Sequence, residues 1–284
     1  QTNEHHHPTL QITGTNGQLA PLDLSRLQAT IEKASEGLEG IDVQAIIEET
    51  VKNLYNGVKA TDISTTMMMA TRTRIEQEPN YTYVTARLLR DNLVATGLEF
   101  LGLSTETSEA DALETYLKKG VELELLSPEL LNFDLAKLAE AIEPERSNQF
   151  TYLGLQTLFD RYFIHSDDVR FELPQLFFMR VSMGLSLNEA NREESAIEFY
   201  NLLSRFDYMA STPTLFNSGT LRPQLSSCYL TTIADDLYNI YGSMRDNALL
   251  SKWAGGLGND WTPVRALNSY IKGTNGKSQG VVPF

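Results

Sequence analysis

The sequence predicts an α/β chain whose N-terminal part is all-α. Apolar residues recur at helical spacing, between caps and proline or glycine breaks, from about residue 24 to residue 206. After Pro213 the composition shifts toward Ser, Thr, Asn and Gly, and residues 225–232 alternate and end in β-branched side chains, as strands do. The 284 residues, 42% of them hydrophobic, are enough to bury a sizeable core.

A β-hairpin is expected to open the fold, because Asn16-Gly17 lies between short apolar runs and both residues tolerate positive φ. Asp23 or Ser25 caps a first helix, and Gly37 ends it. The hairpin, this first helix and three further helices are expected to form a compact unit that ends near residue 100. A disordered tail over 1–9 is expected to precede it. The three further helices are expected over 43–54, 61–75 and 81–98.

The helical pattern continues from 104 to 200, with breaks at Pro128, Pro144, the turn at 165–168 and Pro174. Within it, the stretch 195–206 has clear helical periodicity, which predicts one buried face. That face is expected to carry Ala196, Phe199, Leu203 and Phe206.

The last part of the chain has a strand, helix and loop pattern. The strand over 225–232 is followed by Asp235-Asp236, which is typical of a helix N-cap. The helix that starts there is expected to give way to a glycine-rich loop at 254–259. Such loops let backbone N–H groups approach a phosphate closely, but the glycine spacing matches neither a P-loop nor a dinucleotide-binding pattern.

Charge and composition exclude several function classes. The chain has 37 acidic and 23 basic side chains and a formal charge of -14, which disfavours a nucleic-acid polymer or an anionic membrane surface as partner. It contains no window long and apolar enough for a membrane span and no secretion-signal layout, so we expect a cytoplasmic protein. His5-His6-His7 stands in a polar tail, and we assign it no function and predict no metal site.

Cys228 is the only cysteine, so no disulfide can close within the chain. It is also the only side chain with redox or strong nucleophilic capacity. From the residues alone, a buried structural cysteine is the more common outcome for such a residue. The polar Ser226-Ser227-Cys228 run on a predicted strand, followed by a capped helix and a glycine loop, favours a functional thiol.

Several motifs follow one another toward the C-terminal end: 213–219 (PTLFNSG), 224–230 (QLSSCYL), 250–259 (LSKWAGGLGN), 271–276 (IKGTNG) and 280–284 (GVVPF). Together they resemble the start of the catalytic barrel of ribonucleotide reductases. Upstream, 150–156 (FTYLGLQ) and 173–181 (LPQLFFMRV) are similar to the helical domain that precedes this barrel in bacterial class Ia large subunits. By resemblance, the chain is identified as the N-terminal part of the large catalytic subunit of a class I ribonucleotide reductase.

The resemblance implies a division of the chain into an ATP-cone-like unit, a helical domain and the first half of a ten-stranded α/β barrel. The expected bounds are 10–100, 101–210 and 211–284.

The resemblance also assigns roles in ribonucleotide reduction. Cys228 would be one of two thiols that end the cycle as a disulfide, because reduction at the ribose 2′ carbon needs a proton donor for the leaving hydroxyl and two electrons. Thr214, Ser227 and the backbone at Gly255 and Gly256 would hold the ribose and diphosphate of the substrate. Taken singly, Thr214 could be only a turn residue, and the glycines could only permit close packing.

A second implied site binds the deoxynucleoside triphosphate or ATP that selects the substrate, as an allosteric effector. Its residues would be Asp235, Asp236, Leu237, Arg265 and Lys272. Asp235 could also be a plain helix cap, and Arg265 a solvated charge. The helix from Leu237 would pair with its copy in a second subunit, so that the effector lies at a dimer interface.

Residues 10–98 resemble the ATP cone but depart from its pattern. A pair of cations should precede Asn16-Gly17, and this chain has Gly14 and Thr15 there. The positions where the family pattern has a histidine, a threonine and a lysine hold Ser64, Ala60 and Ala95. We therefore expect a degenerate cone that does not bind ATP, because a triphosphate would meet an acidic surface without compensating charge.

The remaining reductase cysteines lie beyond Phe284 in the family pattern, which predicts a split subunit. The expected partners are a complementary C-terminal fragment, a second copy of this chain, a small metal-containing subunit that generates the radical, and thioredoxin or glutaredoxin. Two alternatives stay open: part of a class II, cobalamin-dependent reductase, and a catalytically inactive regulatory or scaffold paralogue.

Overall fold

The computed structural model describes residues 10–14, 16–253 and 255–284. The tail over 1–9, which includes the three consecutive histidines, and Thr15 lie outside these residues. In the described part of the chain, no helix has both the length and the apolar character needed to cross a membrane.

The hairpin and the four helices form as predicted. β1 (Gln11–Thr13) pairs antiparallel with β2 (Leu19–Pro21), and Gly17 in the turn has a φ of 74°. β1 also pairs in parallel with a short strand that the sequence did not predict, β3 (Val58–Lys59). The helices are α1 (Leu24–Ser35), α2 (Val43–Lys52), α3 (Ala60–Arg72) and α4 (Tyr81–Phe100), and α3 stops three residues before the predicted Ile75.

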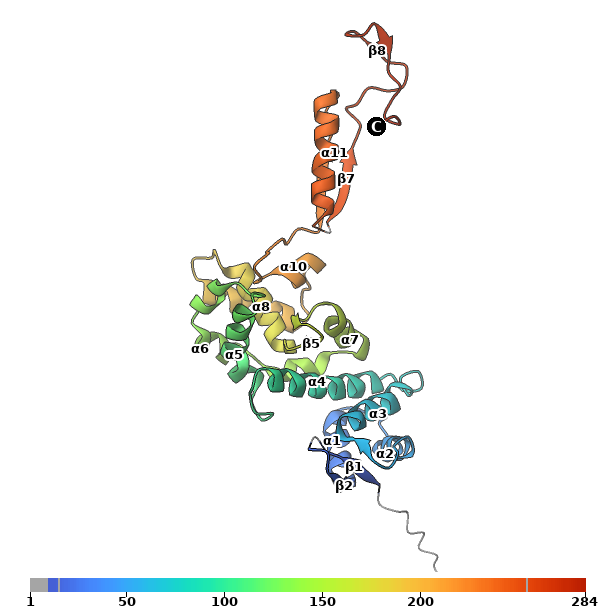
Figure 1. The fold of residues 1–284 in the computed structure, drawn as a ribbon, viewed down its shortest axis with the longest axis vertical. Coiled ribbons are helices and arrows are strands. Elements are labelled where there is room, and N and C mark those ends of the chain that lie inside the picture. Colours follow the sequence, from blue (N-terminus) through green and yellow to red (C-terminus); the bar gives the residue numbers. More distant parts are fainter. Residues whose placement is uncertain (1–9, 15, 254) are drawn as a thin grey trace, which may run out of the picture.

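Asp23 is the cap of α1: its carboxylate accepts a hydrogen bond of 3.1 Å from the backbone N–H of Arg26. The apolar stripes of α1, α2 and α3 bury against the first half of α4. The second half of α4 belongs to a different core, since Leu88 packs with the first helices whereas Leu89 and Leu93 pack with the next ones. One continuous helix therefore joins the two cores (Figure 1).

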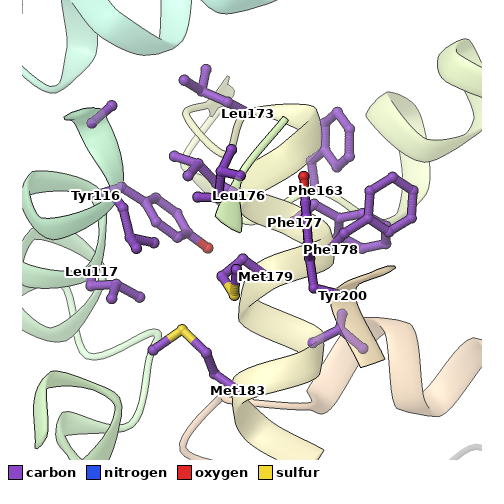
Figure 2. Close-up of a cluster of buried hydrophobic side chains, with 14 of the residues drawn as sticks. Tyr116, Leu117, Phe163, Leu173, Leu176, Phe177, Phe178, Met179, Met183 and Tyr200 are labelled. Atoms are coloured by element: carbon purple, nitrogen blue, oxygen red, sulfur yellow. The ribbon is translucent and has the colours of Figure 1, made fainter. Parts of the chain in front are cut away.

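The second core is a helical body built around α8 (Pro174–Ser186), in which nearly every side chain is buried. Figure 2 shows Tyr116 and Leu117 facing α8 from one side and Phe163 and Tyr200 packed against it from the other. The predicted proline breaks are helix starts, because proline in the first turn removes no intrahelical hydrogen bond. Around α8 lie α5 (Glu109–Glu122), η1 (Pro128–Asn132), α6 (Leu135–Ala141), η2 (Pro144–Gln149), α7 (Tyr152–Arg161), β4 (His165–Ser166), β5 (Val169–Arg170), α9 (Arg192–Ser204) and α10 (Thr212–Asn217).

The predicted buried face of α9 is partly wrong. Ala196 and Leu203 are buried as expected, and Tyr200 is fully buried beside them. Phe199 is only half-buried, and Phe206 is 39% exposed. Phe206 lies past the helix end at a φ of 63°, so the helical spacing no longer sets its direction.

The C-terminal part contains a parallel β–α–β unit made of β6 (Cys228–Thr232), α11 (Leu237–Ser251) and β7 (Gly256–Asp260), followed by a small hairpin of β8 (Tyr270–Ile271) and β9 (Gly276–Lys277). In Figure 1 this unit stands beyond α10, joined to the helical body by an extended segment. The glycine-rich stretch predicted as a loop is strand β7, apart from Gly255 and from Ala254, which lies outside the described residues. Gly256 and Gly258 alternate with Leu257 and Asn259 there, and the stretch is a strand because each of its residues pairs with a residue of β6.

Candidate functional site

Cys228 begins β6 and lies on its open face. Cys228, Leu230 and Thr232 are exposed, whereas Tyr229 and Thr231 between them are half-buried. This alternation follows from the two-residue period of a strand. The thiol therefore points to solvent, and the buried structural cysteine is not what forms.

Gly256 is the residue paired with Cys228 in the parallel ladder. A Cβ added there would lie 3.7 Å from Cys228 Sγ, so the glycine leaves free space beside the thiol. The N–H of Gly256 donates a 2.8 Å hydrogen bond to the carbonyl of Ser227 and is not free for a phosphate. Gly256 therefore leaves space for a ligand beside the thiol but gives it no free backbone N–H donor.

Gly255 has a packing role. A Cβ at this position would lie 2.2 Å from the ring of Tyr229, because that ring packs directly against the backbone of Gly255. The close-packing alternative therefore describes Gly255 in this conformation.

Thr214 and Ser227 approach the start of β6 in different ways. Thr214 is half-buried in α10, and its hydroxyl donates a 3.2 Å hydrogen bond to the carbonyl of Leu225. The hydroxyl oxygen can still accept a hydrogen bond from a ligand. Ser227 is exposed next to Cys228.

Two residues that the sequence analysis missed hold this region together. Asn217, on α10, donates a 2.8 Å hydrogen bond to the carbonyl of Gln224. The side-chain amide of Gln224 donates to the carbonyls of Ser226 and Trp253, at 3.0 and 3.2 Å, and its oxygen accepts from the N–H of Ser226. These contacts explain why β6 begins at Cys228 rather than at the predicted Leu225. Both side chains lie within the motifs at 213–219 and 224–230, but nothing in the spacing of these motifs marks them as residues that bind the backbone of a neighbouring segment.

Asp235 and Arg265, two of the predicted effector residues, are in contact. Arg265 Nε donates to Asp235 Oδ2 at 2.8 Å, and the backbone N–H of Arg265 donates to Asp235 Oδ1 at 3.3 Å. Both side chains are about one-third exposed, at 32% for Asp235 and 37% for Arg265. The guanidinium of Arg265 is thus paired with a carboxylate, while about a third of its side chain stays exposed to solvent.

Asp236, not Asp235, caps α11. Its carboxylate accepts hydrogen bonds from the backbone N–H and the side-chain amide of Asn239, and these bonds lower the pKa of Asp236. Leu237 is 63% exposed, and Tyr238 and Tyr241 beside it on α11 are also exposed. Lys272 is exposed in the turn between β8 and β9, and it makes no hydrogen bond or ion pair with residues 235–237 in the described part of the chain.

A separate cavity of about 560 Å³ lies in the N-terminal unit, between β1, α1, α3 and α4. Ala60, Ser64 and Ala95, the three neutral residues at predicted nucleotide-site positions, all line it. Among its described lining residues Arg26 carries the positive charge, while Asp23 and Asp91 are acidic. The structure therefore brings the predicted positions together around a space of nucleotide size but of unfavourable charge.

No cluster of His, Cys, Asp and Glu suited to a metal ion exists among the residues the structure describes. The chemistry available at Cys228 is that of a thiol beside hydroxyl and backbone groups.

Three family models match successive parts of the chain. They describe the ATP cone domain, over 10–95, the ribonucleotide reductase all-alpha domain, over 148–223, and the ribonucleotide reductase barrel domain, over 226–284. The barrel match includes β6, α11 and β7, and the cone match includes the cavity between β1 and α4.

Curated relatives match nearly the whole chain. Ribonucleoside-diphosphate reductase subunit alpha of Chlamydia muridarum is 46% identical over 280 residues, which is 97% of this chain and 27% of that protein. The same subunit of Helicobacter pylori is 34% identical over 278 residues, 97% of this chain and 34% of the relative. The large subunit of Caenorhabditis elegans is 33% identical over 280 residues, 96% and 35% of the two chains. The chain spans about a quarter to a third of the length of these relatives.

Proposed function

The chain belongs to the ribonucleotide reductase large-subunit family, and on that premise we propose that it supplies a redox-active thiol, substrate contacts and an effector site to a ribonucleoside-diphosphate reductase. The relatives carry that activity in their names. For this chain the activity, its substrates and its partners are our proposal.

The observation that carries the proposal is the position of Cys228. The thiol is exposed on the open face of β6, beside the space that Gly256 leaves. In the proposed reaction Cys228 and a second thiol together give two electrons and two protons. The ribose 2′ hydroxyl leaves as water, and the two sulfurs end as a disulfide. Ser227 and the Thr214 oxygen lie near the start of the same strand, where they can bind ribose or diphosphate oxygens.

The test is nucleoside diphosphate reduction by a complete large subunit that contains this chain, assembled with its radical subunit and an external reductant. Cys228→Ser should abolish multiple turnover, because one remaining thiol cannot form the disulfide. Ser226→Ala, which removes an exposed hydroxyl two residues away, should retain activity. Multiple turnover at the wild-type rate by Cys228→Ser would contradict the assigned role.

The effector site is proposed around the start of α11. The Asp235–Arg265 pair and the exposed apolar residues Leu237, Tyr238 and Tyr241 support a nucleotide bound where α11 meets its copy in a second subunit. Lys272 would complete this site only if the β8–β9 hairpin moves toward it. Dimer formation that strengthens on addition of a deoxynucleoside triphosphate would support this placement.

Further subunits or segments should cover the open side of the β–α–β unit. Leu230 of β6 is 87% exposed, and Val282, in the segment after β9, is 91% exposed, which is unfavourable for apolar side chains in water. We propose that the rest of the barrel covers them, as a continuation of the polypeptide or as the separate C-terminal fragment. A metal-containing radical subunit and thioredoxin or glutaredoxin complete the proposed set of partners. The domain division at residues 100 and 210 remains part of this proposal.

The cone is proposed not to bind ATP. Its described lining carries Arg26 together with the acidic Asp23 and Asp91 and the neutral Ala60, Ser64 and Ala95. A triphosphate carries several negative charges and needs cationic donors close by.

A further inference from the structure

Arg180 forms a fully buried ion pair at the centre of the helical body. Its Nε and one terminal nitrogen donate to the two carboxylate oxygens of Glu172, at 3.0 and 2.9 Å, in the fork geometry that guanidinium and carboxylate groups share. Both side chains are 0% exposed. The Tyr116 hydroxyl and the backbone N–H of Ile164 also donate to Glu172, so the carboxylate is fully engaged.

The remaining terminal nitrogen of Arg180 reaches α10. It donates to the carbonyls of Leu215 and Ser218, both at 2.9 Å. Ser218 returns a hydrogen bond from its hydroxyl to the carbonyl of Val181, at 2.7 Å. The C-terminal end of α10 is therefore tied to α8 at three points, all of them buried.

From α10 the polar contacts continue to the strand that bears the thiol. Thr214 and Asn217 donate to the carbonyls of Leu225 and Gln224. The Gln224 side chain then holds Ser226 and the carbonyl of Trp253, just before β7. A set of hydrogen bonds thus runs from Arg180 through α10 to the two segments that precede β6, which carries Cys228, and its neighbour β7.

We propose that Arg180 is a positioning residue for the substrate site: it fixes α10, and through Thr214 and Asn217 it fixes the start of the Cys228 strand. The kinetic part of this inference rests on the proposed function, whereas the structural part does not. Among the described residues, Arg180 makes no hydrogen bond to Cys228, Thr214 or Ser227, so its effect on the site passes through α10.

The geometry requires arginine and not merely a positive charge. Four donors of the guanidinium point in two directions, toward Glu172 and toward α10. A lysine ammonium is a single point that can satisfy Glu172 or the α10 carbonyls but lacks the planar fork that does both. Arg180→Lys therefore keeps the buried charge and should lose the hold on α10.

The matched control is Arg146→Lys. Arg146 is also a buried arginine of the helical body, bound to Asn201, Ser204 and Glu143, and among the described residues it makes no hydrogen bond or ion pair with α10. Amide hydrogen exchange, measured on the full chain, tests whether Arg180 holds α10 and the start of the Cys228 strand in place. Arg180→Lys should speed exchange of amides in 212–226 by about tenfold, while Arg146→Lys leaves them near the wild-type rate. Equal exchange in the two variants would overturn the proposal.

A second variant covers the case in which Arg180→Lys fails to fold. Asn217→Ala removes a half-buried link further along the path and leaves the Glu172 pair intact. It should speed exchange at 224–226 in the same way, and unchanged exchange there would also overturn the proposal.

Kinetics on the assembled reductase separate positioning from stability. Arg180→Lys should raise KM for the nucleoside diphosphate by about tenfold, and Arg146→Lys should not. An unchanged KM in both variants would overturn the kinetic role. If the assembled wild-type protein shows no reductase activity but Arg180→Lys still speeds amide exchange at 212–226, the positioning role holds and the proposed function is refuted.

Discussion

Cys228 and Gly256 are direct neighbours in the β6–β7 ladder, and a methyl group on Gly256 would lie 3.7 Å from the Cys228 sulfur. This is an ordinary van der Waals distance, so Gly256→Ala should fold. The methyl group would nevertheless occupy the space beside the thiol. We predict that Gly256→Ala lowers kcat/KM for nucleoside diphosphate reduction by about 10²-fold, because reacting groups tolerate little displacement.

Gly258 provides the control for this prediction, since it lies two residues further along the same face of β7. A Cβ there meets only the far end of the exposed Leu230 side chain, at 2.9 Å, and that side chain can rotate away. Gly258→Ala should reduce activity far less than Gly256→Ala. Equal losses in the two variants would mean that the effect is on the strand and not on the space beside the thiol.

Glu109 makes stability depend on pH near neutrality. It is 5% exposed at the start of α5, and its carboxylate accepts a 2.8 Å hydrogen bond from the N–H of Gln175 in the first turn of α8. Burial raises its pKa from 4.5 to about 7, although the Gln175 hydrogen bond opposes the shift. The folded chain therefore holds a proton on Glu109 that the unfolded chain releases between pH 4.5 and about 7.

The stabilisation from this proton is fully present below pH 4.5 and is lost as the pH rises through about 7. A pKa difference of this size corresponds to about 3 kcal/mol. Glu109→Gln keeps an oxygen acceptor for Gln175 and does not titrate. We expect urea denaturation to show the variant more stable than wild type at pH 8, with the advantage gone at pH 5. A pH-independent difference between the two proteins would contradict the assignment.

The fold was predictable wherever one local signal decided it. The Asn16-Gly17 turn, the Asp23 cap and the apolar stripes of α1 to α4 act within a few residues and formed as expected. β3 was missed because two residues pairing with β1 across a long separation leave no periodic signal.

The candidate site was only partly predictable from the sequence, because some of its contacts also join residues that are far apart in the chain. The exposure of Cys228 follows from strand alternation, which the sequence displays. By contrast, the roles of Asp235 and Asp236 depended on Arg265, thirty residues away, whose contact with Asp235 left Asp236 to cap the helix. The roles of Arg180 and Gln224 were not predicted, because they depend on hydrogen-bond partners far away in the sequence and not on neighbouring residues.

The cone cavity gives a binding prediction. Titration calorimetry of the chain with ATP and dATP should show no micromolar binding, because the described lining of the cavity has one cation, Arg26, and two carboxylates, Asp23 and Asp91. A variant that combines Ser64→His and Ala95→Lys adds two potential cations to the lining and should gain affinity for the triphosphate. Micromolar binding by the wild-type chain would refute the degenerate cone.

The close approach between α8 and the residues that follow α10 gives a stability prediction. Gly184 of α8 lies against the chain at 218–219, where an added Cβ would be 2.1 Å from the N–H nitrogen of Gly219 and 2.3 Å from the Ser218 hydroxyl. Gly242 of α11 has no atom within 4 Å of an added Cβ. In an unobstructed helix, alanine in place of glycine stabilises by about 0.5–1 kcal/mol. We predict that Gly242→Ala raises the melting temperature and that Gly184→Ala lowers it, because α8 and α10 must separate to admit the methyl group. Thermal unfolding followed by circular dichroism measures both changes. A rise in both variants would show that the α8–α10 contact yields easily, and it would weaken the case that α10 is held in one fixed position.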